Sequence, residues 1–383
     1  MVPLLIMLMG FEFGVSLFGP LLPQVQTEFL VSTGSVALAL SVYHGIRLLI
    51  NVPAGRMIAR VALPRALAAG GAILALGGTI VAAAPSFPVV LVGRALMGMG
   101  SAVFFITGQL WISRVATPDT KAQLFSYHQV SSLTGSALGP AVGGAVAGLL
   151  SWRYSLVLAV LAGLTAVMTA RRLADPAVEG RTPTAAPASS SAGPLRLRQM
   201  LGPGMGMLGN FFFYGGMSAT LIPLFAAREI HLGPGAIGGV LMLGTLQRFG
   251  AALAGGRLVR LFGTRRTVLL SLVAMALCVL SFLTVGSPIG LIVAVSLVSW
   301  ANIGGSFIVA LVTDIMPEAH WGTALGFNRT MGDVGAVIAP LLVGFIIDHQ
   351  GFNAAFILVA CVLVLTAGAA GVLLATGRRT HEA

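Results

Sequence analysis

The chain has 383 residues, of which 57% are hydrophobic and only 9% charged, whereas a soluble domain carries about 25% charged residues. This composition excludes a water-soluble domain, and the mean hydropathy of +0.96 predicts a protein whose solvent is lipid. The net charge of +11 would fit a nucleic-acid-binding protein, but the basic residues are scattered between apolar segments and form no basic stripe, so we expect no nucleic-acid partner.

Twelve segments are apolar over about the 20 residues that a helix needs to cross a bilayer. In chain order, the predicted membrane helices cover residues 3–25, 34–54, 66–85, 88–113, 122–149, 153–173, 203–226, 235–255, 267–286, 288–314, 324–347 and 352–376. The predicted fold class is therefore an all-α membrane protein with twelve transmembrane helices.

The basic residues outside the predicted spans or at their ends are divided unequally between the two sides. Sixteen lie in loops or in the tail on one side, and only Arg153 and Arg228 lie on the other. Because Lys and Arg accumulate on the cytoplasmic side of membrane proteins, both termini are predicted to be cytoplasmic. We expect a multi-pass integral protein of the bacterial plasma (inner) membrane.

The chain has two similar halves. Residues 174–200 are rich in Pro, Ala and Ser and are interpreted as a flexible cytoplasmic linker between bundles at residues 1–173 and 201–376, with a tail at 377–383. Arg47 and Arg248 occupy corresponding positions at an offset of 201 residues. A repeat of this kind predicts two six-helix bundles with a binding site at their interface near the bilayer midplane.

The predicted helix at 122–149 contains Gly135, Gly139, Pro140, Gly143 and Gly144. Glycines four residues apart give a flat face on which another helix packs closely. Pro140 removes a backbone hydrogen bond and permits a kink. A flat face that can bend would suit one bundle rocking on another, and the alternative interpretation is tight packing alone.

Two basic motifs follow the second and eighth predicted helices. The first contains Gly55, Arg56 and Arg60, and the second contains Gly256 and Arg257. The glycine allows a close approach at the end of the helix, and the arginines would bind carbonyl groups and lipid phosphates at the inner surface. The alternative is simple anchoring at that surface.

These motifs, together with Arg94-x-x-x-Gly98-x-Gly100, resemble the major facilitator superfamily over essentially the whole chain. The glycine–proline motif is similar to that of the drug:proton antiporters. The resemblance implies two pseudo-symmetric six-helix bundles, transport by alternating access and a link between Arg94 and proton coupling. The family's acidic residue is replaced in both basic motifs, by Ala59 and Arg260, so a latch that uses this acid is an open question here.

Six charged residues lie away from the ends of the predicted spans: Glu12, Arg47, Arg94, Arg248, Arg329 and Asp333. A charge in the hydrocarbon layer costs roughly 2.5–3.5 kcal/mol on insertion scales, so such residues usually face a water-filled cavity. Glu12 lies between two phenylalanines and is the first candidate proton carrier, with permanent pairing to an arginine as the alternative. Asp333 is the second candidate, although it lies four residues after Arg329 and could simply neutralise it.

Arg47 and Arg248 support a different function. A symmetric pair of arginines about 12 Å deep in the membrane could clamp a carboxylate or another oxyanion. The candidate substrate-binding residues are Arg47, Arg248, Arg329, Asn210 and Tyr214. The alternative for Asn210 is a hydrogen bond between helices, and the alternative for Tyr214 is a position that faces lipid or the protein core.

The leading hypothesis is a monomeric secondary active transporter that couples protons to the efflux of a small amphiphilic compound or drug. The alternatives are a carrier of small organic or inorganic anions and a non-transporting sensor or assembly factor. No phosphate-binding glycine-rich loop, metal-spaced His/Cys cluster or nucleophile motif occurs in the sequence. We therefore expect no enzymatic activity, no cofactor and no metal centre, with the substrate, protons and membrane lipids as partners.

Overall fold

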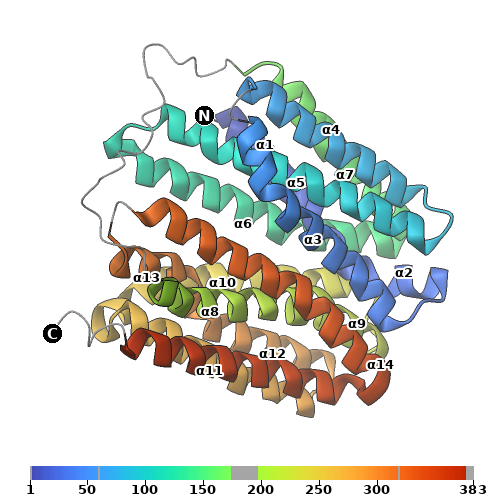
Figure 1. Cartoon of the computed structure of the whole chain (residues 1–383). Helices are drawn as coiled ribbons and strands as arrows, with labels where there is room; N and C mark the ends of the chain where they lie inside the picture. Colours follow the sequence, from blue (N-terminus) through green and yellow to red (C-terminus); the bar gives the residue numbers. More distant parts are fainter. Residues whose placement is uncertain (1, 59–60, 174–196, 318–319, 377–383) are drawn as a thin grey trace. The chain divides into compact units, whose positions relative to one another are not determined.

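The computed structural model describes residues 2–58, 61–173, 197–317 and 320–376, which are helical throughout apart from short turns (Figure 1). Within these ranges, ten helices are long and apolar enough to cross a membrane. The last of them, α14 (Trp321–Thr376), is broken at Gly351, and α6 (Pro118–Leu149) is a further long helix. With α14 counted as two helices and α6 added, the described residues are consistent with the twelve predicted spans.

The described helices form two compact units, and each has its own packing. Unit 1 contains Met1–Ala177 and Ile222–Thr245, and unit 2 contains Val178–Leu221 and Leu246–Ala383. The division thus follows contacts and not chain order alone.

Within the described residues, unit 1 contains nine further helical segments besides α6, counting the beginning of α10, and α4 packs against both α5 and α7 (Figure 1). In chain order these segments are α1 (Val2–Ser16), η1 (Gly19–Leu21), α2 (Leu22–Phe29), α3 (Thr33–Ile58), α4 (Leu63–Ala82), α5 (Phe87–Val115) and α7 (Trp152–Ala170), followed by α9 (Ile222–Arg228) and the beginning of α10 (Pro234–Phe262). Pro20 and Pro23 lie at the break between α1 and α2, where each removes a backbone donor.

Small residues explain why α4 can pack on two neighbours. A Cβ on Gly77 would lie 2.7 Å from the carbonyl oxygen of Gly93 on α5. On another face of α4, a Cβ on Gly71 would lie 2.8 Å from the carbonyl oxygen of Gly163 on α7. Both distances are shorter than a van der Waals contact, so only glycine lets these backbones approach so closely.

Unit 2 is built around α14, against which α8 and α11 pack (Figure 1). Its other segments, besides the end of α10, are α8 (Leu197–Phe212), the π-helix η2 (Phe213–Leu221), α11 (Thr264–Leu280), η3 (Ser281–Thr284), α12 (Pro288–Ala301), the 3-10 helix η4 (Asn302–Phe307) and α13 (Ile308–Ile315). The predicted spans 203–226 and 288–314 are therefore interrupted helices.

The described residues of the basic motifs lie in helices and not in loops. Gly55 and Arg56 belong to the end of α3, and Gly256 and Arg257 belong to α10, which continues to Phe262. Gly263, with φ of +80°, ends α10 directly before α11. The predicted spans ended where apolar residues end, but a helix can continue through arginines, which have good helix propensity.

Some predicted segments lie outside the described residues: Arg60 of the first basic motif, residues 174–196 of the linker, and the tail at 377–383. The last residues of the predicted linker are helical, because α8 begins at Leu197.

Candidate functional site

Tyr43 is the centre of a buried polar cluster in unit 1. Its hydroxyl group donates a hydrogen bond to Oγ of Ser101, at 2.7 Å. The guanidinium carbon of Arg94 lies 4.7 Å from the centre of the Tyr43 ring, and that of Arg47 lies 5.9 Å from it. We call Tyr43, Arg47, Arg94 and Ser101 the Tyr43 cluster.

Arg94 is held by neutral groups that solvate its charge. The side chain is only 2% exposed, and its Nε donates to the carbonyl oxygen of Ala39 at 3.2 Å. Its guanidinium carbon also lies 4.3 Å from the centre of the Phe18 ring, so two aromatic rings flank the cation. A backbone carbonyl and two rings partly replace the water that this buried charge has lost.

Glu12 lies where α1 meets α6. A Cβ on Gly135 of α6 would lie 3.0 Å from the Cβ of Glu12. Its neighbour Phe11 points to α5, where it stacks on Phe104 with ring centres 4.1 Å apart. Phe11 therefore faces α5, and Glu12 lies on the side of the glycine–proline motif.

The motif glycines of α6 form the packing face that the sequence predicts. A Cβ on Gly139 would lie 2.6 Å from the carbonyl oxygen of Phe13, and one on Gly143 would lie 2.6 Å from a methyl group of Leu17. Gly144 instead faces Pro234 at the beginning of α10, and the carbonyl of Pro140 faces Gly238. Close packing is confirmed, whereas a role for this face in motion stays a prediction.

The predicted charged pair of unit 2 is present. Nε of Arg329 lies 3.8 Å from Oδ1 of Asp333, and the side chain of Asp333 is completely buried while that of Arg329 is 52% exposed. The guanidinium carbon of Arg329 lies 5.2 Å from the centre of the Phe211 ring. That of Arg248 lies 4.6 Å from the Tyr214 ring, so two predicted substrate-binding residues are in contact.

The two units divide the candidate residues between them. Glu12, Arg47 and Arg94 belong to unit 1, and Arg248, Arg329, Asp333, Asn210 and Tyr214 belong to unit 2. The clamp by Arg47 and Arg248 therefore stays a prediction. Sequence reasoning missed Tyr43 and Ser101, although a tyrosine four residues before an intramembrane arginine, on the same helix face, could have indicated the cluster.

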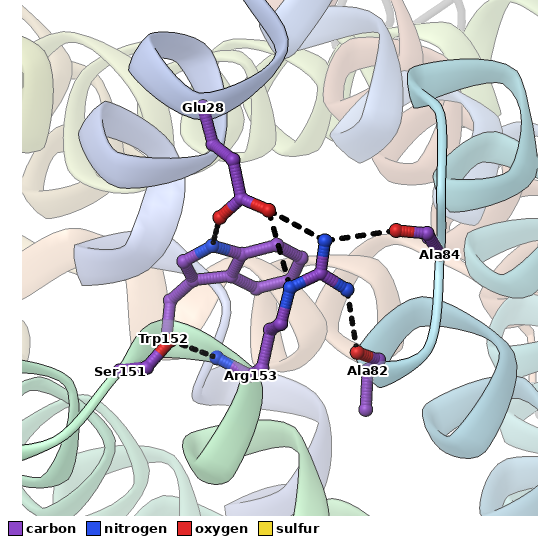
Figure 2. Close-up of polar contacts among 6 residues, drawn as sticks. All are labelled: Glu28, Ala82, Ala84, Ser151, Trp152 and Arg153. Atoms are coloured by element: carbon purple, nitrogen blue, oxygen red, sulfur yellow. Dashed lines mark hydrogen bonds and ion pairs between the residues drawn. The ribbon is translucent and has the colours of Figure 1, made fainter.

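A second polar cluster joins the ends of three helices in unit 1 (Figure 2). Nη2 of Arg153 lies 2.5 Å from Oε1 of Glu28, and the guanidinium also donates to the carbonyl oxygens of Ala82 at 2.7 Å and Ala84 at 2.8 Å. The indole of Trp152 donates to the other carboxylate oxygen (Figure 2). Arg153 thus caps the C-terminal end of α4, which explains a basic residue on the side that the charge distribution disfavours.

No group of three or more His, Cys, Asp or Glu side chains that could hold a metal ion occurs in the described part of the chain. The model of the Major Facilitator Superfamily matches residues 4–218 and, a second time, residues 205–383. The chain belongs to the Major Facilitator Superfamily. It is therefore a multi-pass membrane transporter and not an enzyme.

No curated protein matches the sequence of this superfamily member significantly. Several solved structures share its fold. A peptide transporter, POT, crystallised in complex with sulfate, is 14% identical with a TM-score of 0.79. The match covers 99% of this chain and 94% of the POT chain. A bacterial homologue of the human lysosomal transporter Spinster, in an inward-facing and occupied conformation, is 12% identical with a TM-score of 0.80, covering 98% and 96%. At these identities the likeness shows the fold alone.

Proposed function

We propose that this superfamily member is a secondary active transporter that exports a small amphiphilic compound in exchange for protons. The observation that carries the proposal is the position of Glu12, a carboxylic acid at the α1–α6 contact. A group that gains and loses a proton next to a flexible packing face can link protonation to helix movement.

Glu12 is the proton carrier in this proposal. Arg47 and Arg94 contribute two positive charges near the Tyr43 ring, and loss of the Glu12 proton changes the net charge of the same unit by one. Such a change in a region of low dielectric has a larger electrostatic effect than it would have in water. Asp333, buried beside Arg329, is the second candidate carrier.

The moving bodies are proposed to be the two repeat halves, residues 1–173 and 201–376, joined by the linker at 174–200. Gly139 and Pro140 on α6 support movement because they combine a close helix contact with a missing backbone hydrogen bond. The protein acts as a monomer in the bacterial inner membrane, with both termini and the tail at 377–383 in the cytoplasm.

Glu12→Gln tests the proton carrier directly. The amide keeps the size of the side chain and its hydrogen bonding but cannot ionise, so we expect proton-driven efflux of a lipophilic cationic dye in everted vesicles to fall at least tenfold. Size-exclusion chromatography checks that the variant folds. Glu229→Gln, an exposed position after α9, is the matched control. Efflux by Glu12→Gln at the wild-type rate would rule out this role.

An anion carrier is the second candidate function. The guanidinium groups of Arg248 and Arg329 lie against the Tyr214 and Phe211 rings, an arrangement that orients their planar donors for an oxyanion. Arg47→Ala and Arg248→Ala should then each weaken binding of benzoate to the purified protein without weakening binding of a cationic dye. If both ligands are affected, or neither, the clamp is wrong.

A further inference from the structure

Two asparagines meet in unit 2 at the points where two helices change form. Asn210 lies two residues before the end of α8, where the π-helix η2 begins, and Asn302 follows the last residue of α12 and opens the 3-10 helix η4. A Cβ on Gly305 of η4 would clash with Oδ1 of Asn302 and would lie 2.7 Å from Oδ1 of Asn210. Both amide oxygens therefore point to the same place beside Gly305.

Neither oxygen has a hydrogen-bond donor among the described residues, although both atoms are buried. Asn302 as a whole is only 8% exposed. A buried acceptor without a partner destabilises a folded protein, and two such acceptors at one place require an explanation.

Contacts with α11 stabilise the helix break at η4, which interrupts the predicted span 288–314. Oγ of Ser271 on α11 donates to the carbonyl oxygen of Ala301 at 2.6 Å and accepts a hydrogen bond from the backbone N–H of Gly304 at 2.9 Å. A Cβ on Gly304 would lie 2.5 Å from the Cβ of Ser271, so the packing of η4 on α11 also requires glycine. The position of Asn302 is thus fixed from both sides.

We propose that Oδ1 of Asn210 and Oδ1 of Asn302 are ligands of a compact monovalent cation, for which Na⁺ is the natural probe. Amide oxygens are hard ligands of the kind that hard cations prefer. Interrupted membrane helices commonly coordinate such ions, because their C-terminal ends and unwound carbonyls present negative dipole ends. Because both side chains are neutral, a divalent ion would keep most of its charge uncompensated in an apolar interior.

The test is thermal unfolding of the purified full chain in NaCl, KCl and choline chloride at equal ionic strength. An ion that binds only the folded protein raises the unfolding midpoint in a saturable way, and we expect a rise of about 2 °C or more in NaCl over choline chloride. For each variant, the unfolding midpoint in NaCl is compared with the midpoint of the same variant in choline chloride, so a change in its basal stability does not affect the result.

Three substitutions separate the site from its surroundings. Asn302→Leu removes one ligand, and Gly305→Ala places a methyl group against both oxygens, so the response to NaCl should disappear in each. Asn302→Asp keeps the side-chain oxygen of Asn302 and adds a negative charge, so the unfolding midpoint should rise at a lower Na⁺ concentration. Asn353→Leu, at an exposed position on α14, is the matched control and should respond like the wild type.

The proposal is overturned if the wild-type midpoint is the same in NaCl and choline chloride, as expected if the two amides simply hydrogen-bond to each other after exchange of nitrogen and oxygen in one of them. It is also overturned if Asn302→Leu keeps the response. A rise shared by KCl and NaCl and lost in the variants supports a monovalent site without selectivity. Glu12→Gln should keep the response, so the result is independent of the proposed proton carrier.

Discussion

At the scale of single residues, Tyr43 explains how two arginines can lie within one apolar unit. Its ring contacts both guanidinium groups while its hydroxyl bonds to Ser101, a side chain with no exposed surface. The ring faces attract the cations, and the buried hydroxyl has its partner. Ring and hydroxyl therefore make separate contributions that substitutions can separate.

Tyr43→Phe should remove the hydroxyl contribution alone. We expect the free energy of unfolding to fall by about 1 kcal/mol, the net value of one hydrogen bond. Tyr43→Leu should cost more, because Arg94 then also loses an aromatic face. Unfolding in mixed detergent micelles measures both. Tyr154→Phe, at a residue that is 59% exposed, should have no effect. Equal stability of Tyr43→Phe and the wild type would contradict this role of the hydroxyl.

Single residues also show what the sequence could and could not predict. The Arg329–Asp333 pair follows from spacing within one helix, and the structure contains it. The contacts of Arg94 with Phe18 and Ala39 join different helices, and the identity of such partners depends on how each helix is rotated. An apolar sequence encodes that rotation weakly, because lipid and protein interior are both apolar.

At the scale of elements, the glycine face of α6 is the feature of unit 1 that the sequence predicted best, although the helix that packs on it was not predicted. The glycines of α6 lie on one face because they recur every four residues, and the contacts of Gly139 with α1 and of Gly143 with Leu17, directly after α1, follow this spacing. The helix breaks at η2 and η4 were not predicted, since no proline lies within either of them. The η4 break depends on Ser271 from another helix.

Gly135→Ala should destabilise the α1–α6 contact. The new Cβ would clash with the carbonyl of Met9 and lie 2.9 Å from the backbone nitrogen of Phe13, and backbone atoms cannot move aside as a flexible side chain can. We expect a loss of about 1–3 kcal/mol in the free energy of unfolding. Gly148→Ala on the same helix, whose Cβ would lie 3.6 Å from its nearest neighbour, is the control. An equal effect of both substitutions would show that α6 does not pack on α1 as described.

At the scale of the whole molecule, composition and charge distribution predicted the membrane fold, and the family match and the helices confirm it. The bounds of the repeat halves stay a prediction. Gly144 on α6 packs against the beginning of α10, and Gly238 on α10 packs against α6. These contacts show why Ile222–Thr245 belongs to unit 1 although it follows the predicted linker. Sequence alone could not predict this, because a repeat defines similarity along the chain and not which surfaces touch.

The central claim is exchange of substrate for protons through Glu12. The most direct test is luminal pH in proteoliposomes loaded with a lipophilic cationic dye, with no initial pH gradient and the membrane potential clamped. Dye leaving through the wild-type protein should draw protons inward and acidify the lumen, and Glu12→Gln should abolish the acidification. Dye efflux through the wild-type protein without any change in luminal pH would contradict the account.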